Sequence, residues 1–96
     1  MRYATWAGSF LLFATLSAAA SDVDLVIPKC VDGLVTVTAK QPWHTNPEAP
    51  WAWDKGHVVS KDLSQVKFKG TKCEGKVKAF IVNGDQHKGP IATPIK

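Results

Sequence analysis

The side chains best suited to acid–base chemistry in this chain are three histidines, His44, His57 and His87. Paired with Glu48 or Glu74, His57 or His87 could supply the acid and base of RNA cleavage. That reaction also needs a fixed cation, often a guanidinium, to stabilise the phosphorane. Ordinary surface histidines are the simpler interpretation, and a ribonuclease-like protein stays as an alternative.

Other catalytic signatures are missing from the sequence. The single arginine, Arg2, lies in a segment that we expect to be removed. No Gly-x-Ser-x-Gly motif occurs, and Gly70-Thr71-Lys72 lacks the upstream glycine of a phosphate-binding loop. We therefore expect no enzyme activity, no cofactor and no metal site.

The first twenty residues have the layout of a secretory signal. They open with Arg2, continue through a short apolar run and end in alanines 18–20. A membrane anchor is the competing interpretation, but polar residues interrupt the run, and no later stretch is long enough to span a bilayer. We predict cleavage after Ala20, which leaves 21–96 as one secreted domain.

Export determines how the two cysteines, Cys30 and Cys73, are interpreted. In an oxidising compartment, an even cysteine count in a small domain favours a disulfide. Two cysteines alone do not make a zinc site, and a catalytic thiol would leave the other cysteine unpaired. We predict one bridge, closing a loop of about 43 residues.

Short alternating and β-branched stretches make up the mature chain, and no long helical period appears, so we predict an all-β domain. Prolines 42, 47 and 50 mark segment 41–50 as an exposed loop. The strands that we expect cover 23–27, 34–40, 51–53 with 57–60, 65–69, 76–82 and 86–92.

The charge pattern indicates a binding surface. After Arg2 is removed, eleven lysines face eight acidic residues. Lys67, Lys69, Lys76 and Lys78 would share one face if their two strands pair, and such a patch suits an acidic partner. A solvated sheet face and an edge guarded by lysines are the alternatives. We expect no nucleic acid partner, because no aromatic residues alternate with the lysines.

Three tryptophans lie within eleven residues. Trp51 and Trp53 are two positions apart, so they face one side of a strand, and we expect them in the core. Trp43 lies beside His44 in the proline-rich loop, where an exposed indole would anchor an interface.

A family resemblance rests on the order of these features. Segment 65–84 holds an alternating strand, a polar turn ending in Cys73, an apolar strand and Asn83-Gly84, and Cys30-Val31-x-Gly33 lies upstream. This order resembles the MAX effectors, the avirulence and ToxB-like proteins of plant-pathogenic fungi. The resemblance implies a six-stranded sandwich of two antiparallel three-stranded sheets, held by a Cys30–Cys73 disulfide.

The resemblance also implies a non-catalytic effector, delivered into plant tissue and able to enter the host cytoplasm. Such a protein binds host proteins, heavy-metal-associated domains among them, by extending a sheet edge, and immune receptors detect some members. We expect a monomer that uses 36–40 as the edge and Trp43 with His44 as the anchor. The predicted partner-binding residues are Thr36, Thr38, Lys40, Trp43, His44, Lys67, Lys69, Lys76 and Lys78.

A second alternative is a small basic toxin or antimicrobial protein that acts on membranes or competitors. The lysine content permits it, but toxins of this size are usually denser in disulfides. No amphipathic helix is visible in the sequence either. We therefore place it behind the effector.

Overall fold

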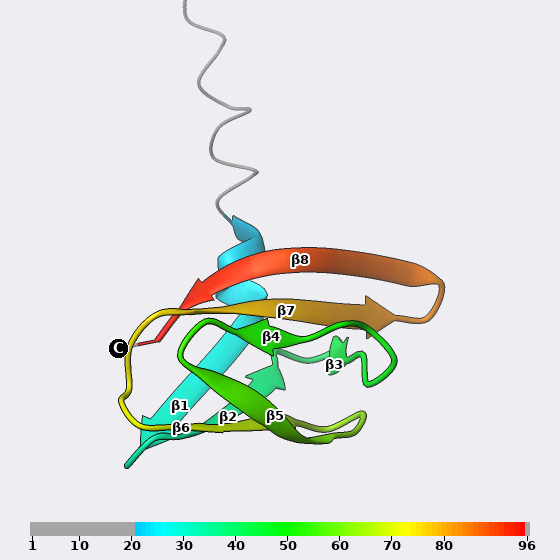
Figure 1. Ribbon diagram of the computed structural model, residues 1–96. Coiled ribbons are helices and arrows are strands. Elements are labelled where there is room, and N and C mark those ends of the chain that lie inside the picture. The colour runs from blue at the N-terminus through cyan, green and yellow to red at the C-terminus, as the bar shows by residue number, and fades with distance from the viewer. Residues whose placement is uncertain (1–20, 96) are drawn as a thin grey trace, which may run out of the picture.

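The computed structural model describes residues 21–95. They form a short 3-10 helix followed along the chain by the strands of two antiparallel sheets (Figure 1). The predicted all-β, sandwich-like class is confirmed. The helix, η1, spans Ser21–Leu25, and within the described residues no helix has the length and apolarity needed to cross a membrane. The predicted signal, 1–20, lies outside the described residues.

The first sheet, which we call sheet A, has the strand order β1-β2-β6-β5. Every neighbouring pair in it is antiparallel. The period-two alternation of strands buries one face against the second sheet and leaves the other in solvent. Its strands are β1 (Val26–Val31), β2 (Leu34–Ala39), β6 (Val66–Gly70) and β5 (Gly56–Lys61).

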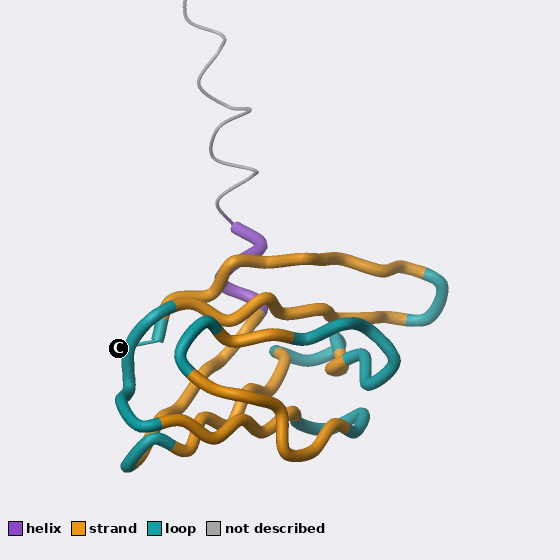
Figure 2. The backbone as a smooth tube through the Cα atoms, viewed as in Figure 1, coloured by secondary structure: helices purple, strands orange, loops and turns teal. Residues whose placement is uncertain are grey.

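The second sheet, sheet B, is built around β7 (Lys76–Asn83). β8 (Gln86–Pro94) pairs along one side of β7, while β3 (His44–Thr45) and β4 (Ala52–Trp53) pair with successive parts of its other side. Figure 2 shows the β6–β7 connection running from one sheet to the other. The described chain thus has eight strands in two four-stranded sheets, instead of six in two three-stranded sheets.

The extra strands come from the proline-rich region. β3 lies inside the predicted loop 41–50, while the predicted pieces 51–53 and 57–60 correspond to two separate strands, β4 and β5. Each of β3 and β4 has only two residues, so neither has a recognisable local pattern. They count as strands because the eight-residue β7 is long enough to pair with both.

The first strand also differs from the prediction. Residues 23–25 belong to η1, and β1 begins at Val26 and continues through Pro28 to Val31. Proline has no backbone N–H, so we expected it to end the strand. β1 is an edge strand with one neighbour, β2, and an edge tolerates a missing donor.

The core lies between the inner faces of the two sheets. Phe68 of β6 and Ile81 of β7 are fully buried in it. Trp51 and Trp53 are 5% and 4% exposed, which confirms them as core residues, and both rings lie about 6 Å from the Phe68 ring. The aromatic side chains therefore connect the β4 region of sheet B to the interior of sheet A.

The predicted disulfide between Cys30 and Cys73 is confirmed. It joins β1 to the connection between β6 and β7, with the two Cα atoms 5.8 Å apart. The bridge therefore ties the edge of sheet A to the segment that leads into sheet B.

Candidate functional site

The outer face of sheet A carries a row of cationic and polar side chains. Antiparallel register places Lys29 of β1 opposite Thr36 of β2, and Thr36 opposite Lys67 of β6. Ser60 of β5 completes the row. Directly paired residues point to the same face, so the two lysines flank Thr36 at a backbone separation of about 10 Å, two strand spacings.

The adjacent row combines apolar and cationic side chains. Val31 lies opposite Leu34, Leu34 opposite Lys69, and Lys69 opposite His57. Val31 is 69% exposed and Leu34 is 42% exposed, and their direct pairing places two aliphatic side chains together at the surface. The outer face of sheet A is therefore both basic and partly apolar.

No acidic side chain in the strands neutralises these lysines. All eight aspartates and glutamates lie in η1 or in connections, and none lies in a strand. Among the described residues, the ion pairs are Lys55 with Glu74, at 4.0 Å, and Lys88 with Asp22, at 3.4 Å. Neither pair involves the outer face of sheet A. We call the surface formed by Lys29, Lys67 and Lys69, with His57 beside Lys69, the cationic face.

The cationic face borders an open strand edge, β5. Within the described chain, β5 hydrogen-bonds to β6 on one side, and no strand pairs with its other side. Figure 1 shows β5 at the margin of sheet A, away from β1. Four of its six side chains are exposed, and it contains no proline. A single irregularity, between Val58 and Ser60, leaves Val59 without a partner residue in β6.

The other sheet margins are less accessible to an added strand. β1 contains Pro28, which cannot donate a ladder hydrogen bond, and η1 packs beside it. β8 contacts η1, is tied to it by the Lys88–Asp22 pair, and contains Pro90. β3 and β4 have two residues each. Among residues 21–95, β5 is therefore the longest edge strand without proline, and its contacts outside sheet A include β4, which precedes it in the chain.

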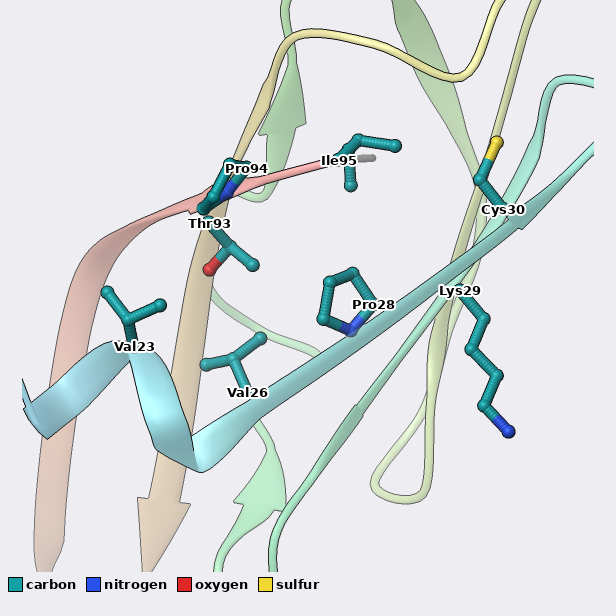
Figure 3. Close-up of a pocket in the computed structure, with 8 residues that line it drawn as sticks. All are labelled: Val23, Val26, Pro28, Lys29, Cys30, Thr93, Pro94 and Ile95. Carbon is teal, nitrogen blue, oxygen red and sulfur yellow. The ribbon is translucent and has the colours of Figure 1, made fainter.

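A hollow of about 340 Å³ lies between β1 and the end of β8 (Figure 3). Apolar side chains dominate its lining, with Val26 and Pro28 on one side and Ile95 on the other. Lys29 also borders it, but its side chain turns away from Val26 and Pro28 (Figure 3), as expected for a residue of the outer face.

The predicted edge, 36–40, is wrong. Thr36 lies inside sheet A, with Lys29 on one side and Lys67 on the other. Thr38 pairs with Ile27 of β1, and Lys40 follows the strand, donating its N–H to the Leu25 carbonyl. β1 pairs with β2 along its whole length and β6 pairs with it as far as Val37, so Thr38 and Ala39 alone lack a partner in β6.

The predicted basic patch is divided between two surfaces. Lys67 and Lys69 belong to β6 in sheet A, whereas Lys76 and Lys78 belong to β7 in sheet B. The two strands are consecutive in the chain but do not pair, because the β6–β7 connection crosses between the sheets. Lys67 and Lys69 therefore share a face with Lys29, and the face shared with Lys76 and Lys78 does not exist.

Trp43 is not the exposed anchor that its loop position suggested. It is half-buried against the core, and the Lys88 ammonium lies 5.8 Å from its ring centroid. His44 is exposed and opens β3, opposite Val82 of β7. His44 thus belongs to sheet B, and Trp43 immediately precedes it, so neither residue is part of the cationic face of sheet A.

The histidines do not converge on one site. His57 belongs to sheet A, while His44 and His87 lie on either side of Val82 in sheet B. The described residues contain no group of three histidine, cysteine or acidic side chains placed to hold a metal. Glu74 pairs with Lys55 and Glu48 lies in the 46–51 loop, so neither is shown bonded to a histidine.

The carboxylate of Asp62 has a lowered pKa. The Asp62 carboxylate accepts hydrogen bonds from the Ser64 hydroxyl, the Ser64 N–H and the Gln65 N–H, at 2.7 to 2.9 Å. These bonds, the Ser64 hydroxyl first, lower the pKa of Asp62. Because Asp62 closes the turn after β5, its charge helps to hold the β5–β6 hairpin.

The sequence prediction missed Lys29 and the role of β5. Lys29 alternates with Pro28 and Cys30, so a strand drawn through Pro28 would have placed it on an outer face. The sequence predicts a strand at 57–60, but nothing local indicates that one of its sides stays unpaired.

Comparison with known proteins found no matching family model, no matching curated protein and no matching solved structure.

Proposed function

We propose that this protein is a secreted, non-catalytic effector that binds host plant proteins by accepting a strand at β5. The observation that carries the proposal is the open six-residue edge of β5, bordered on one side by the cationic face. Main-chain hydrogen bonds along such an edge give affinity, and alternate side chains give specificity. The MAX-effector resemblance supports the same mode and suggests heavy-metal-associated domains as one class of partner.

Two features together support secretion. The leader has the three-part layout of an export signal, and a Cys30–Cys73 bridge forms in oxidising compartments. The bridge would be made before delivery, so the folded domain reaches plant tissue already cross-linked. Entry into the host cytoplasm and detection by an immune receptor are parts of the proposal that rest on the resemblance alone.

A membrane target is less favourable on magnitude. Each lysine near an anionic lipid surface contributes about 1 kcal/mol, and the cationic face holds three lysines, Lys29, Lys67 and Lys69. The sum, about 3 kcal/mol, corresponds to binding weaker than millimolar. Backbone pairing along β5 adds directional hydrogen bonds that a lipid surface does not offer.

The test uses the oxidised secreted protein as bait for plant extract and for a purified heavy-metal-associated domain. Val59→Pro removes a backbone N–H from β5 at the residue that has no partner in β6, so it should disturb the β5–β6 register less than a proline at a paired position. We expect at least tenfold weaker capture. Val59→Thr, which keeps the N–H, should bind like the parent.

Amide hydrogen exchange provides the second readout. Binding of the partner should slow exchange in β5 of the parent, and circular dichroism should show that both Val59 variants are folded. Capture that is unchanged by Val59→Pro, with no protection in β5, would refute the proposed edge.

A further inference from the structure

If another strand paired with β5, lysines would lie beside only one of its two faces, the one that continues the outer face of sheet A. His57 of β5 lies opposite Lys69, and Ser60 of β5 lies opposite Lys67. A strand that pairs with β5 would continue these two rows by one position each. On the outer face, its side chains would therefore meet His57 and Ser60 directly, with the two lysines of β6 one strand further in.

The spacing of these lysines matches that of the added strand. Lys67 and Lys69 are two residues apart on β6, which places them about 7 Å apart, and alternate residues of any extended strand repeat at the same distance. The added strand lies about 10 Å from β6, two strand spacings, and long lysine and glutamate side chains can bridge this distance. The short Ser60 separates the added strand from Lys67, whereas in the Lys69 row His57 lies between and a carboxylate there would meet both side chains. The strands of sheet A contain no acidic residue. Asp62, in the β5–β6 connection, is near enough for the Lys67 charge to contribute to its lowered pKa, but no ion pair joins the two among the described residues.

The inner side of the same edge has a different character. Val58 of β5 packs against the hydrophobic core, and the Lys61 ammonium donates to the Ala49 carbonyl at 3.2 Å. That ammonium is held by the protein's own loop, so it is not directed to a partner. Side chains of an added strand that point inward would meet an apolar margin.

We propose that the partner strand alternates acidic and apolar residues, with its carboxylates on the outer face of sheet A beside Lys67 and Lys69. This inference rests on the proposed strand addition at β5 and names the chemistry of the segment that β5 accepts. Opposite charges one row apart give both attraction and register, because a slip by one residue would turn every carboxylate toward the apolar side.

The experiment titrates the oxidised protein with three seven-residue peptides while NMR follows the β5 amides. One peptide alternates glutamate with valine, and the other two carry glutamine or lysine in place of glutamate. We expect the glutamate peptide to bind at least tenfold more tightly than the glutamine peptide at low salt, with the lysine peptide weakest. The advantage should shrink as salt is raised.

Two double variants separate local charge from net charge. Lys67→Gln with Lys69→Gln should weaken glutamate-peptide binding at least tenfold. Lys76→Gln with Lys78→Gln removes the same charge at the same spacing from β7 of sheet B, and it should weaken binding less than threefold.

The outcomes distinguish the two proposals. If the glutamine peptide binds as tightly, or both double variants weaken binding alike, the acidic-strand proposal is wrong while strand addition stands. If no peptide shifts or protects the β5 amides, the proposed edge itself is wrong. Binding only to phosphatidylserine vesicles, lost when Lys67 and Lys69 are changed, would assign the cationic face to membranes and overturn the proposal.

Discussion

At the scale of single residues, two glycines make room for a buried indole. Gly56 and Gly70 are paired across β5 and β6, and the Trp53 ring lies over both. A Cβ at Gly70 would come within 2.7 Å of the ring and would also meet the Lys55 carbonyl. The Trp53 N–H donates to the Glu74 carbonyl at 2.8 Å, which fixes the indole in this position.

Gly70→Ala should therefore destabilise the domain by about 1–3 kcal/mol, because neither the buried ring nor the backbone carbonyl can move away freely. Urea denaturation followed by tryptophan fluorescence measures the change. Thr71→Ala, at the exposed next residue, is the control and should stay within about 0.5 kcal/mol of the parent. Equal stability of Gly70→Ala and the parent would show that the ring is not confined by this glycine.

Asp62 gives a pH dependence at the same scale. Its pKa is lowered in the folded state, so its stabilisation is present above the unfolded pKa, near 4, and is lost as pH falls through the folded value. Asp62→Asn should be less stable than the parent at pH 7, and the difference should shrink below about pH 4. Urea midpoints at pH 7 and pH 3 test this, with Asp85→Asn in another exposed turn as the charge control. A difference that does not depend on pH would contradict it.

At the scale of elements, the β5–β6 hairpin is attached to sheet B at both ends. The connection from β4 to β5 joins the sheets at one end. At the other end, the fully buried Thr45 of β3 donates its hydroxyl to the Asp62 carbonyl at 2.6 Å. The edge proposed for binding is therefore held in place before any partner arrives, which reduces the ordering cost of strand addition.

Thr45→Val should release the far end of this hairpin. Replacing the hydroxyl with a methyl group keeps the shape and removes one hydrogen bond, so we expect a loss of about 1 kcal/mol. Amide exchange should accelerate in β5 more than in β8. Thr93→Val is the matched control, because Thr93 is also buried but its hydroxyl bonds only within β8. Equal exchange effects of the two variants would argue against a specific anchor.

At the scale of the whole molecule, the fold determines where the charges lie and which segments the disulfide joins. Seven of the lysines lie in strands, while every carboxylate lies in η1 or a connection, so both outer sheet faces are basic. Opposite charges are therefore separated between the sheet faces and the connections. The disulfide joins β1 of sheet A to the segment that enters sheet B, so it constrains both sheets at once.

Removing this bridge should cost a large part of the stability. Closing a loop with a separation of 43 residues stabilises the folded state by about 4 kcal/mol in the chain-entropy model. A small domain has a net stability of only about 5–15 kcal/mol. Cys30→Ser with Cys73→Ser should therefore lower the free energy of unfolding by about 4 kcal/mol in urea. The parent measured in reducing agent should match the double variant, and equal stability under oxidising conditions would refute the estimate.

The sequence by itself determined the features that depend on local patterns. Alternation in Leu34–Ala39 and in Val66–Gly70 assigned inner and outer faces, because side chains on a strand repeat every two residues. The even cysteine count, together with the predicted export signal, predicts the disulfide, and the spacing of Trp51 and Trp53 predicts that both rings lie in the core.

Only the tertiary structure decided which strands are neighbours. β2 lies inside sheet A, so Thr36 is not at an edge, and β6 and β7 lie in different sheets, so their lysines form no common patch. Pairing depends on contacts between distant segments, which a period of two residues does not specify. The open edge at β5, and the gathering of Lys29 with Lys67 and Lys69 beside it, follow from that choice of neighbours.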